Sequence, residues 1–339
     1  MFSSINVQSK IRPYNIHFIS DLDNIITLGN ESNTITFVDE NVLNLYPILN
    51  KISRIYDIPC TESIKSYDGV NDIIDVLAYN KANIKTKIIV IGGGILQDLV
   101  GFCASIYCRG IEYTLVPTTL LSMADSCVGG KTSLNYKSRK NILGTFYPPT
   151  DIYINPDFTS TLDHTDYISG IGEIYKFHIL QNKIKDFNFR HNIHEMIYDS
   201  LKYKIDILSR DEFDKGERKY LNFGHTFGHA LETISDNKLP HGIAVIIGSI
   251  IAVKISHHLR YDVPNYNDII SRGIELIKRT GIIVEKTWFD TSTLLEIIKS
   301  DKKSTGKLTM VLINSTPQIT DIEDTTILNE ILNETYEII

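Results

Sequence analysis

The feature that most constrains the fold is an apolar run that breaks into three glycines, KIIVIGGGILQDLVGF at residues 87–102. The run has the length and β-branched residues of a buried strand, and a helical pattern starts directly after the glycines. Three glycines let a backbone approach a phosphate at a helix N-terminus. However, Gln97 stands where the standard dinucleotide fingerprint has its third glycine, so the stretch is equally compatible with a tight strand-to-helix turn.

Strand and helix patterns alternate through the first half of the chain, which predicts a parallel sheet covered by helices. After residues 147–158, where three prolines interrupt the chain, helical patterns dominate. We therefore predict an α/β fold: an N-terminal Rossmann-like nucleotide-binding domain over residues 1–155 and a C-terminal all-helical domain for metal and substrate over 156–339. The expected strands are 34–40, 87–93 and 112–117, and the expected helices of the first domain are 41–50, 71–82 and 95–107.

Charge and cysteine content narrow the possible partners. With 34 basic and 41 acidic residues the net charge is −7, which disfavours a nucleic-acid partner. The longest apolar stretch, residues 242–253, is too short to span a bilayer and predicts a buried helix. The four cysteines form no CxxC pair, so we expect buried thiols in the reducing cytoplasm. A homodimer is expected from the frequency of that state among oligomers.

The most informative stretch is RKYLNFGHTFGHALE, which starts at Arg218. The stretch is predicted to form one helix, in which its polar residues at i, i+4, i+7 and i+11 share a single face. These residues are Arg218, Asn222, His225 and His229. A solvated face would suit a single histidine, but apolar neighbours around this set favour a buried functional face. Thr226 excludes an HExxH protease site.

A metal site is predicted from this stretch and two other positions. His241 begins the apolar stretch that follows it, sixteen residues after His225. Glu173 in GEIYKF is the best candidate for a third ligand, with Lys176 three residues later on the same helix side. A His–His–carboxylate set with open positions is typical of a catalytic divalent metal, and it suits zinc or cobalt.

Basic residues are scattered near apolar stretches and loops, and each one alone is expected to face solvent. If several converge, they indicate a strongly anionic substrate with phosphate and carboxylate groups. The set comprises Arg109, Lys131, Lys140, Lys176, Lys204, Arg218 and Lys303. A P-loop at VGGKTS is excluded, because Asp125 stands where that motif requires its first glycine.

Together these motifs resemble the 3-dehydroquinate synthase family of sugar phosphate cyclases over nearly the whole chain. The resemblance is carried, in order, by GGGILQDLVGF, RGIEYTLVPTTLLSMADSCVGGKTSLN, KNILGTFYPP, GEIYKFHIL, RKYLNFGHTFGHALE, HGIAV and DKKSTGKL. It implies a lyase of the shikimate pathway that converts 3-deoxy-arabino-heptulosonate 7-phosphate to 3-dehydroquinate and phosphate. It also implies a divalent metal and NAD that is reduced and reoxidised within each cycle.

The resemblance further implies a role for each matching residue. The metal ligands would be Glu173, His225 and His241. The catalytic residues would be Lys131, Lys176, Lys204, Arg218, Asn222 and His229, with His229 as the candidate proton relay. The substrate contacts would be Arg109, Asp125, Lys140, Asn141 and Lys303, with Lys302 as an alternative to Lys303. The NAD contacts would be Asp39, Asn41, Glu62, Lys65, Gly93, Gly94, Asp98, Thr118 and Thr119.

The chain departs from the family pattern at three places. Gln97 replaces a usual glycine beside the expected cofactor, and Ile243 replaces a usual glutamate next to a metal ligand. Residues 136–139 also diverge, beside the expected substrate. The second departure bears on metal affinity, because an acid next to a ligating histidine can orient it.

Three other functions stay open on the residues alone. A cyclase that acts on a heptulose phosphate without a carboxylate, as valiolone-type synthases do, would differ at the substrate contacts. A metal-dependent polyol dehydrogenase would lack the basic set and would form NADH. A degenerate cyclase kept as a binding module would have lost metal ligands or bases.

Overall fold

The computed structural model describes residues 4–137, 139–188, 192–301 and 308–339. The chain divides into two compact units, Met1–Leu162 and Asp163–Ile339. The division falls seven residues after the domain boundary expected from the prolines. Each unit has its own core, and each is described by itself below.

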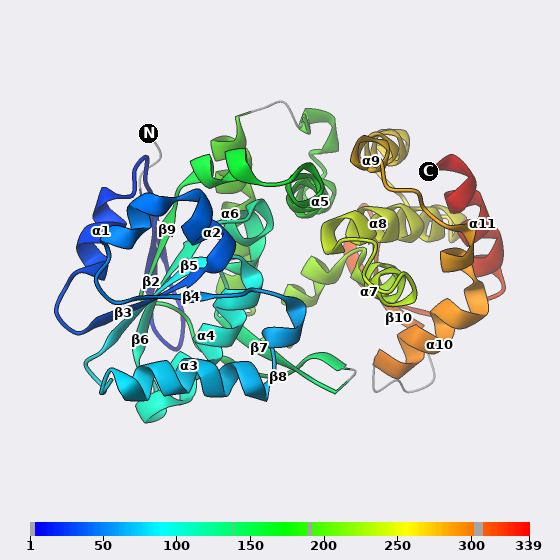
Figure 1. Ribbon diagram of the computed structural model, residues 1–339. Helices are drawn as coiled ribbons and strands as arrows, with labels where there is room; N and C mark the ends of the chain where they lie inside the picture. Colours follow the sequence, from blue (N-terminus) through cyan, green and yellow to red (C-terminus); the bar gives the residue numbers. More distant parts are fainter. Residues whose placement is uncertain (1–3, 138, 189–191, 302–307) are drawn as a thin grey trace. The chain divides into compact units, whose positions relative to one another are not determined.

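The first unit is built on a seven-stranded sheet with the order β1-β2-β9-β6-β5-β3-β4 (Figure 1). Only the β1–β2 pair is antiparallel; β2–β9, β9–β6, β6–β5, β5–β3 and β3–β4 are all parallel. The strands are β1 (Ile5–Val7), β2 (Tyr14–Phe18), β3 (Thr34–Asp39), β4 (Ile55–Ile58), β5 (Lys87–Gly92), β6 (Glu112–Pro117) and β9 (Asp151–Ile154). The three strands expected from sequence are thus confirmed as β3, β5 and β6.

Helices cover both faces of this sheet. Helix α4 packs on β5 and β6 with α3 beside it, and α1 and α2 pack on β3 on the opposite face (Figure 1). These helices are α1 (Asp23–Gly29), α2 (Glu40–Leu45), α3 (Tyr67–Tyr79) and α4 (Gly94–Ile106). A separate hairpin, β7 (Lys131–Tyr136) and β8 (Arg139–Phe146), packs against α4.

The strand order places a ligand-binding position in the first unit. β4 lies on one side of β3 and β5 lies on the other, so the chain reverses direction across the sheet at β3. Parallel sheets bind ligands at the carboxyl ends of their strands where such a reversal occurs. The three glycines start with the last residue of β5, Gly92, and lie at that edge beside the end of β3.

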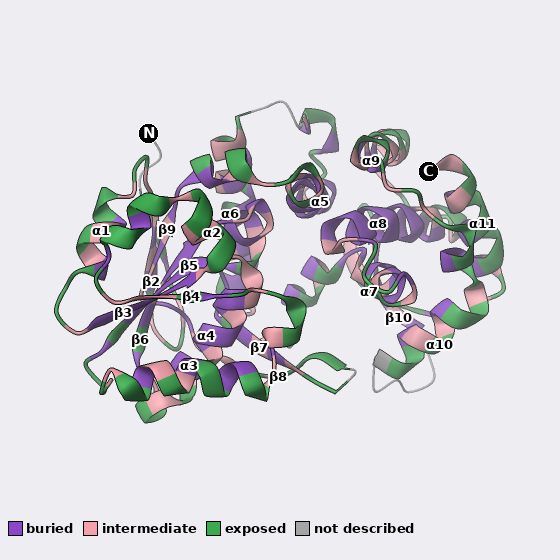
Figure 2. Ribbon diagram, viewed as in Figure 1, coloured by how far each residue is buried: buried purple, intermediate pink, exposed green. Residues whose placement is uncertain are grey.

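The second unit is organised around one apolar helix, α8 (His241–His258), which contacts α5, α7, α9, α11 and β10. Figure 2 shows α8 buried along nearly its whole length. By length and composition α8 could cross a membrane, but 78% of its 18-residue window is buried within the protein, as in a core helix. The other main helices and strands of this unit are α5 (His164–Leu180), α6 (Ile193–Arg210), α7 (His225–Ile234), α9 (Tyr266–Thr280), α10 (Thr291–Asp301), α11 (Ile327–Ile338), β10 (Leu308–Asn314) and β11 (Thr316–Ile322).

Glycines let α8 approach its two main neighbours closely. A Cβ built on Gly242 of α8 would lie 1.7 Å from the Ser169 carbonyl oxygen of α5, and one on Gly172 would lie 2.3 Å from the Gly242 oxygen. Against α7, a Cβ on Gly248 would lie 2.0 Å from the Gly224 oxygen. Side chains at these positions would force the helices apart. The contacts therefore fix the backbones of α5, α7 and α8 relative to one another.

Two sequence expectations are corrected in this unit. The stretch from Arg218 is not one helix: a 3₁₀ turn, Glu217–Asn222, precedes Gly224, whose φ of +77° ends that turn before α7 begins. Arg218 and Asn222 therefore do not share a helical face with His225. In addition, the unit is not all helical, because β10 and β11 form an antiparallel hairpin.

Candidate functional site

The carboxyl edge of the first sheet gathers residues expected to contact NAD. Asp39 ends β3, caps α2 by accepting from the Asn41 backbone N–H, and lies beside Gly92 of β5. Gly93 is the N-cap of α4 and has no side-chain cap, so the first-turn N–H groups of α4 stay available to an anion. Thr119 follows β6 and contacts Gly93.

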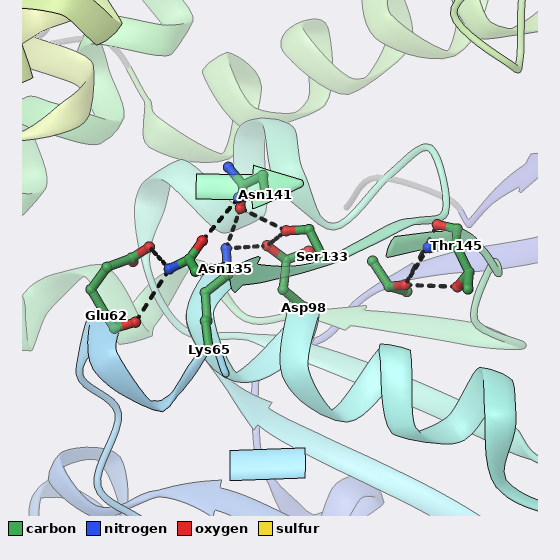
Figure 3. A network of polar contacts seen from close by, with 8 residues as sticks. Glu62, Lys65, Asp98, Ser133, Asn135, Asn141 and Thr145 are labelled. Atoms are coloured by element: carbon green, nitrogen blue, oxygen red, sulfur yellow. Dashed lines mark hydrogen bonds and ion pairs between the residues drawn. The ribbon is translucent and has the colours of Figure 1, made fainter. Parts of the chain in front are cut away.

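A polar network joins four of the predicted residues at this edge (Figure 3). The buried Lys65 ammonium donates to Asp98 Oδ2 and to Asn141 Oδ1, both at 2.7 Å. The Ser133 hydroxyl donates to the same Asp98 oxygen at 2.8 Å. Asn135 links Glu62 to this group, donating to Glu62 Oε1 and accepting from the Asn141 backbone N–H. The network ties α4 to the β7–β8 hairpin.

Burial raises the pKa of Asp98, and the charge and hydrogen bond of Lys65 act against that shift. Ser133 and Asn135 were not predicted as site residues. The one sequence feature that could have identified them is their position in the KTSLN motif, which also contains Lys131.

Gln97 occupies the first turn of α4 and is buried. Its Nε2 donates to the Gly92 carbonyl oxygen at 3.0 Å, which holds the turn between β5 and α4. Its Oε1 has no hydrogen-bond partner among the described residues, and Gln97 lines a pocket with Gly94, Asp98 and Lys131. The departure from glycine therefore adds a hydrogen bond between the first turn of α4 and the end of β5.

The other predicted residues of the first unit fall into two groups. Thr118, Asp125, Lys131 and Lys140 lie near the carboxyl edge: Thr118 just after β6, Asp125 in the π-helical turn Ser122–Ser126, and the two lysines in the β7–β8 hairpin. Arg109 instead precedes β6, at the amino end of the strands, and is exposed. The geometry of this unit does not bring Arg109 to the others, and its role stays a prediction.

In the second unit three helices bring the predicted metal ligands together. Glu173 of α5, His225 of α7 and His241 of α8 come from the helices that the glycine contacts hold close. Glu173 Oε1 lies 3.3 Å from His241 Nε2 and 3.6 Å from His225 Nε2. Both Glu173 oxygens are buried without a well-formed hydrogen bond to any described residue, although ion pairs surround them. Such a carboxylate suits a cation between these side chains.

His229, one turn after His225, also belongs to this cluster. The ligand nitrogens of His225, His229 and His241 all lie within 4.8 Å of one another. His229 is exposed, whereas the other two are partly buried. The cluster therefore offers four donors, and the buried carboxylate makes Glu173, His225 and His241 the better-fitting set.

The charges of this cluster are tightly coupled. Burial would raise the pKa of Glu173, but the Lys176 ammonium, which forms a buried ion pair with it, holds that pKa well below its usual range. Burial and the same ammonium hold the pKa of His225 well below normal. Burial also lowers the pKa of His241, but its interactions with the Glu173 and Glu232 carboxylates outweigh that effect and raise the pKa to about 10.

The raised pKa predicts how the metal-free protein responds to pH. His241 has an ordinary pKa of 6.5 when unfolded and about 10 when folded, so between these values the folded state binds more protons. Its stabilising contribution is complete below pH 6.5 and is lost as the pH rises toward 10. We expect the melting temperature of the chelated protein to fall over this range by more than that of a His241→Asn variant. Equal pH slopes for the two proteins would contradict this assignment.

The predicted basic residues of the second unit are buried to an unusual degree. Lys176, Lys204 and Arg218 have relative exposures of 1%, 6% and 4%. Lys176 lies in α5, Lys204 in α6, and Arg218 donates to the Glu212 carbonyl oxygen. Asn222 is exposed. Lys302 and Lys303 lie outside the described residues.

Glu232 is a residue of this cluster that sequence reasoning missed. Its Oε2 lies 2.9 Å from His241 Nδ1. It follows His225 and His229 at the spacing i, i+4, i+7, which places all three on one face of α7. This spacing could have identified Glu232 as a candidate site residue from the sequence alone.

Comparison with known proteins gives the context of these two sites. Residues 55–169 match the model of the 3-dehydroquinate synthase N-terminal domain, and residues 170–304 match the model of its C-terminal domain. A relative named 3-dehydroquinate synthase from Clostridium tetani (strain Massachusetts / E88) is 34% identical over 324 residues, which cover 88% of this chain and 86% of the relative.

Two solved structures share the fold. A 2-deoxy-scyllo-inosose synthase complexed with carbaglucose-6-phosphate, NAD+ and Co2+ has a TM-score of 0.83 at 22% identity, covering 98% of this chain and 100% of that one. A 2-epi-5-epi-valiolone synthase from Streptomyces hygroscopicus subsp. jinggangensis 5008, with NAD+ and Zn2+ bound, has a TM-score of 0.75 at 21% identity, covering 98% and 97%. At these identities the likeness concerns the fold alone.

Proposed function

The chain belongs to the 3-dehydroquinate synthase family, and from this premise we propose that it converts 3-deoxy-arabino-heptulosonate 7-phosphate to 3-dehydroquinate and phosphate. One structural observation carries the proposal: the Nε2 atoms of His225 and His241 both lie close to the same carboxylate oxygen, Glu173 Oε1. The enzyme is then a phosphate-eliminating lyase of the shikimate pathway that uses NAD and zinc or cobalt.

When bound, NAD would accept and return a hydride at one substrate carbon, and the metal would polarise the oxygen on the reacting carbon. In support, the two solved neighbours carry NAD+ with Co2+ or Zn2+. The first unit would hold the pyrophosphate at the N-terminus of α4, through Gly93 and Gly94. Asp39, Asn41, Glu62, Lys65, Asp98, Thr118 and Thr119 would hold the remainder of the dinucleotide.

In the second unit Glu173, His225 and His241 would hold the metal, and His229 would move a proton at the substrate oxygen. Its exposed ring on the same face as His225 suits that role. The cations Lys176, Lys204 and Arg218, whose side chains are buried, would contact the anionic groups of the substrate, since ionised donors form the stronger hydrogen bonds to phosphate and carboxylate. Asn222, Asp125, Lys131, Lys140, Asn141, Arg109 and Lys303 are the remaining proposed contacts.

One experiment separates this function from its rivals. The metal-loaded protein is incubated with NAD+ and the heptulosonate phosphate, and phosphate and NADH are followed together. Stoichiometric phosphate with no lasting NADH supports the proposal. Turnover only with a heptulose phosphate that lacks the carboxylate would favour a valiolone-type reaction. Net NADH with glycerol would favour a polyol dehydrogenase, and NAD+ and metal binding without any turnover would favour a binding module.

A substitution at Lys65 tests the proposed NAD site. Lys65→Met removes the donor to Asp98 and Asn141, and a hydrogen bond to a charged group contributes about 1.5–3 kcal/mol. We expect NAD+ to bind at least roughly tenfold more weakly, as measured by calorimetry. The matched control is Lys87→Met, whose exposed ammonium pairs with Glu31 at the opposite edge of the sheet. Equal NAD+ affinity in both variants would remove Lys65 from the site.

We also propose that the enzyme is a homodimer of the cytoplasm. All four cysteines lie within the described residues and are thiols, which suits a reducing compartment. Cys103 and Cys127 are buried as expected, whereas Cys60 is half-buried and Cys108 is exposed. Sedimentation equilibrium of the purified protein tests the dimer, and a single species at the 38.5 kDa chain mass would contradict it.

A further inference from the structure

We infer that Glu232 is a positioning residue for the proposed metal site, and that it fixes the orientation and the tautomer of His241. The inference rests on the proposed metal site and adds a residue to it. Glu232 lies in α7 and His241 is the first residue of α8, so the contact between them joins these two helices. It is a side-chain contact of 2.9 Å between Glu232 Oε2 and His241 Nδ1.

The two rings that would bind the metal are held in the same way. His225 Nδ1 lies 3.1 Å from the Phe223 carbonyl oxygen, and His241 Nδ1 lies 2.9 Å from the Glu232 carboxylate. Both partners are acceptors, so each Nδ1 carries a hydrogen and donates it. The remaining nitrogen of each ring, Nε2, faces Glu173 Oε1. Nε2 is therefore the nitrogen that each ring would offer to a metal at this position, once the metal has displaced the proton of His241.

Ile243, two residues after His241 in the chain, does not provide this contact. Ile243 is fully buried and has no polar side-chain atom, so it can pack but cannot accept a hydrogen bond. The carboxylate that contacts His241 instead belongs to Glu232 of α7, the helix that precedes α8. Glu232 is partly buried, which strengthens a hydrogen bond relative to one in water. The chain thus keeps a carboxylate–histidine pair in spite of an apolar residue at position 243.

The test compares Glu232→Ala with Glu232→Gln. Alanine leaves His241 Nδ1 without an acceptor, whereas the glutamine carbonyl oxygen can still accept its hydrogen. We expect alanine to weaken Co2+ binding roughly 10–100-fold and glutamine to recover most of the loss. Co2+ affinity is measured by competition with a chelator, and the visible spectrum of the bound Co2+ reports its coordination. Glu275→Ala is the control, since Glu275 pairs with Arg279 on α9.

The outcomes separate the possible roles of Glu232. Equal weakening by alanine and glutamine, with a changed Co2+ spectrum, would make Glu232 a ligand and overturn the inference. Unchanged Co2+ affinity with a lower melting temperature would make it merely structural and overturn it as well. In a His241→Asn background, Glu232→Ala should have no further effect on affinity. Failure of the wild-type protein to bind Co2+ would overturn the metal site itself, whereas Co2+ binding without phosphate release would leave the inference standing and reject the proposed reaction.

Discussion

Replacing Glu173 with glutamine is expected to abolish tight metal binding and to lower kcat/KM by roughly a thousandfold or more. The carboxylate is fully buried and lies between the Nε2 atoms of His225 and His241. A bound metal contributes several kcal/mol of charge stabilisation in the transition state, and about 1.4 kcal/mol corresponds to a tenfold change in rate. Chelator competition measures the first effect and phosphate release measures the second. Glu296→Gln, at an exposed position of α10, is the control.

Glu173→Gln should also destabilise the metal-free protein, and the reason is independent of metal binding. Glu173 and Lys176 form an ion pair in which each side chain has a relative exposure of 1%. Removing one partner of a buried ion pair typically costs about 3–5 kcal/mol. The double variant Glu173→Gln/Lys176→Met removes both charges and should recover most of the stability but no metal binding. If the double variant is no more stable than the single one, the ion pair is not the source of the loss.

The sequence predicted three of the seven strands of the sheet, and these three are rich in apolar and β-branched residues. β3, β5 and β6 are buried on both faces, so strand length and apolar content were sufficient to find them. The other four strands, β1, β2, β4 and β9, were not predicted, because each has five residues or fewer and carries polar or partly exposed positions. The hairpins β7–β8 and β10–β11 depend on pairing across the chain, which periodicity along one strand does not report.

The candidate metal site shows a similar division. The residue types and spacings of His225, His229 and His241 were visible in the sequence, and the structure brings their nitrogens together. The break at Gly224 was not visible, because a single glycine within a helical pattern is compatible with continuation. Glu232 was missed because its partner lies on another helix. A helical pattern shows which residues share a face but not which helix that face meets.

Gly242→Ala is expected to destabilise the second unit. The sequence did not show that the glycines of α8 lie against the backbone of neighbouring segments. A Cβ on Gly242 would lie 1.7 Å from the Ser169 carbonyl oxygen, a backbone atom that cannot rotate away. The Gly242 N–H also donates to the Ser169 hydroxyl at 2.9 Å, so the two segments cannot separate without losing this bond. Overpacking in a tight core costs about 1–3 kcal/mol and occasionally more. Because the obstacle is backbone, we expect roughly 3 kcal/mol or more.

This substitution should also weaken metal binding, although Gly242 offers no ligand atom. α8 would have to move away from α5, and His241 would move with it relative to Glu173. Metal ligands tolerate displacements of only about 0.5 Å. Gly281→Ala is the control: its Cβ would meet nothing within 4 Å, so it adds only the strain of a φ of +68°, about 1–2 kcal/mol. Thermal unfolding and Co2+ titration of both variants test this prediction, and we expect only Gly242→Ala to lose Co2+ affinity. If both lose the same stability and neither loses Co2+ affinity, close helix approach is not what assembles the metal ligands.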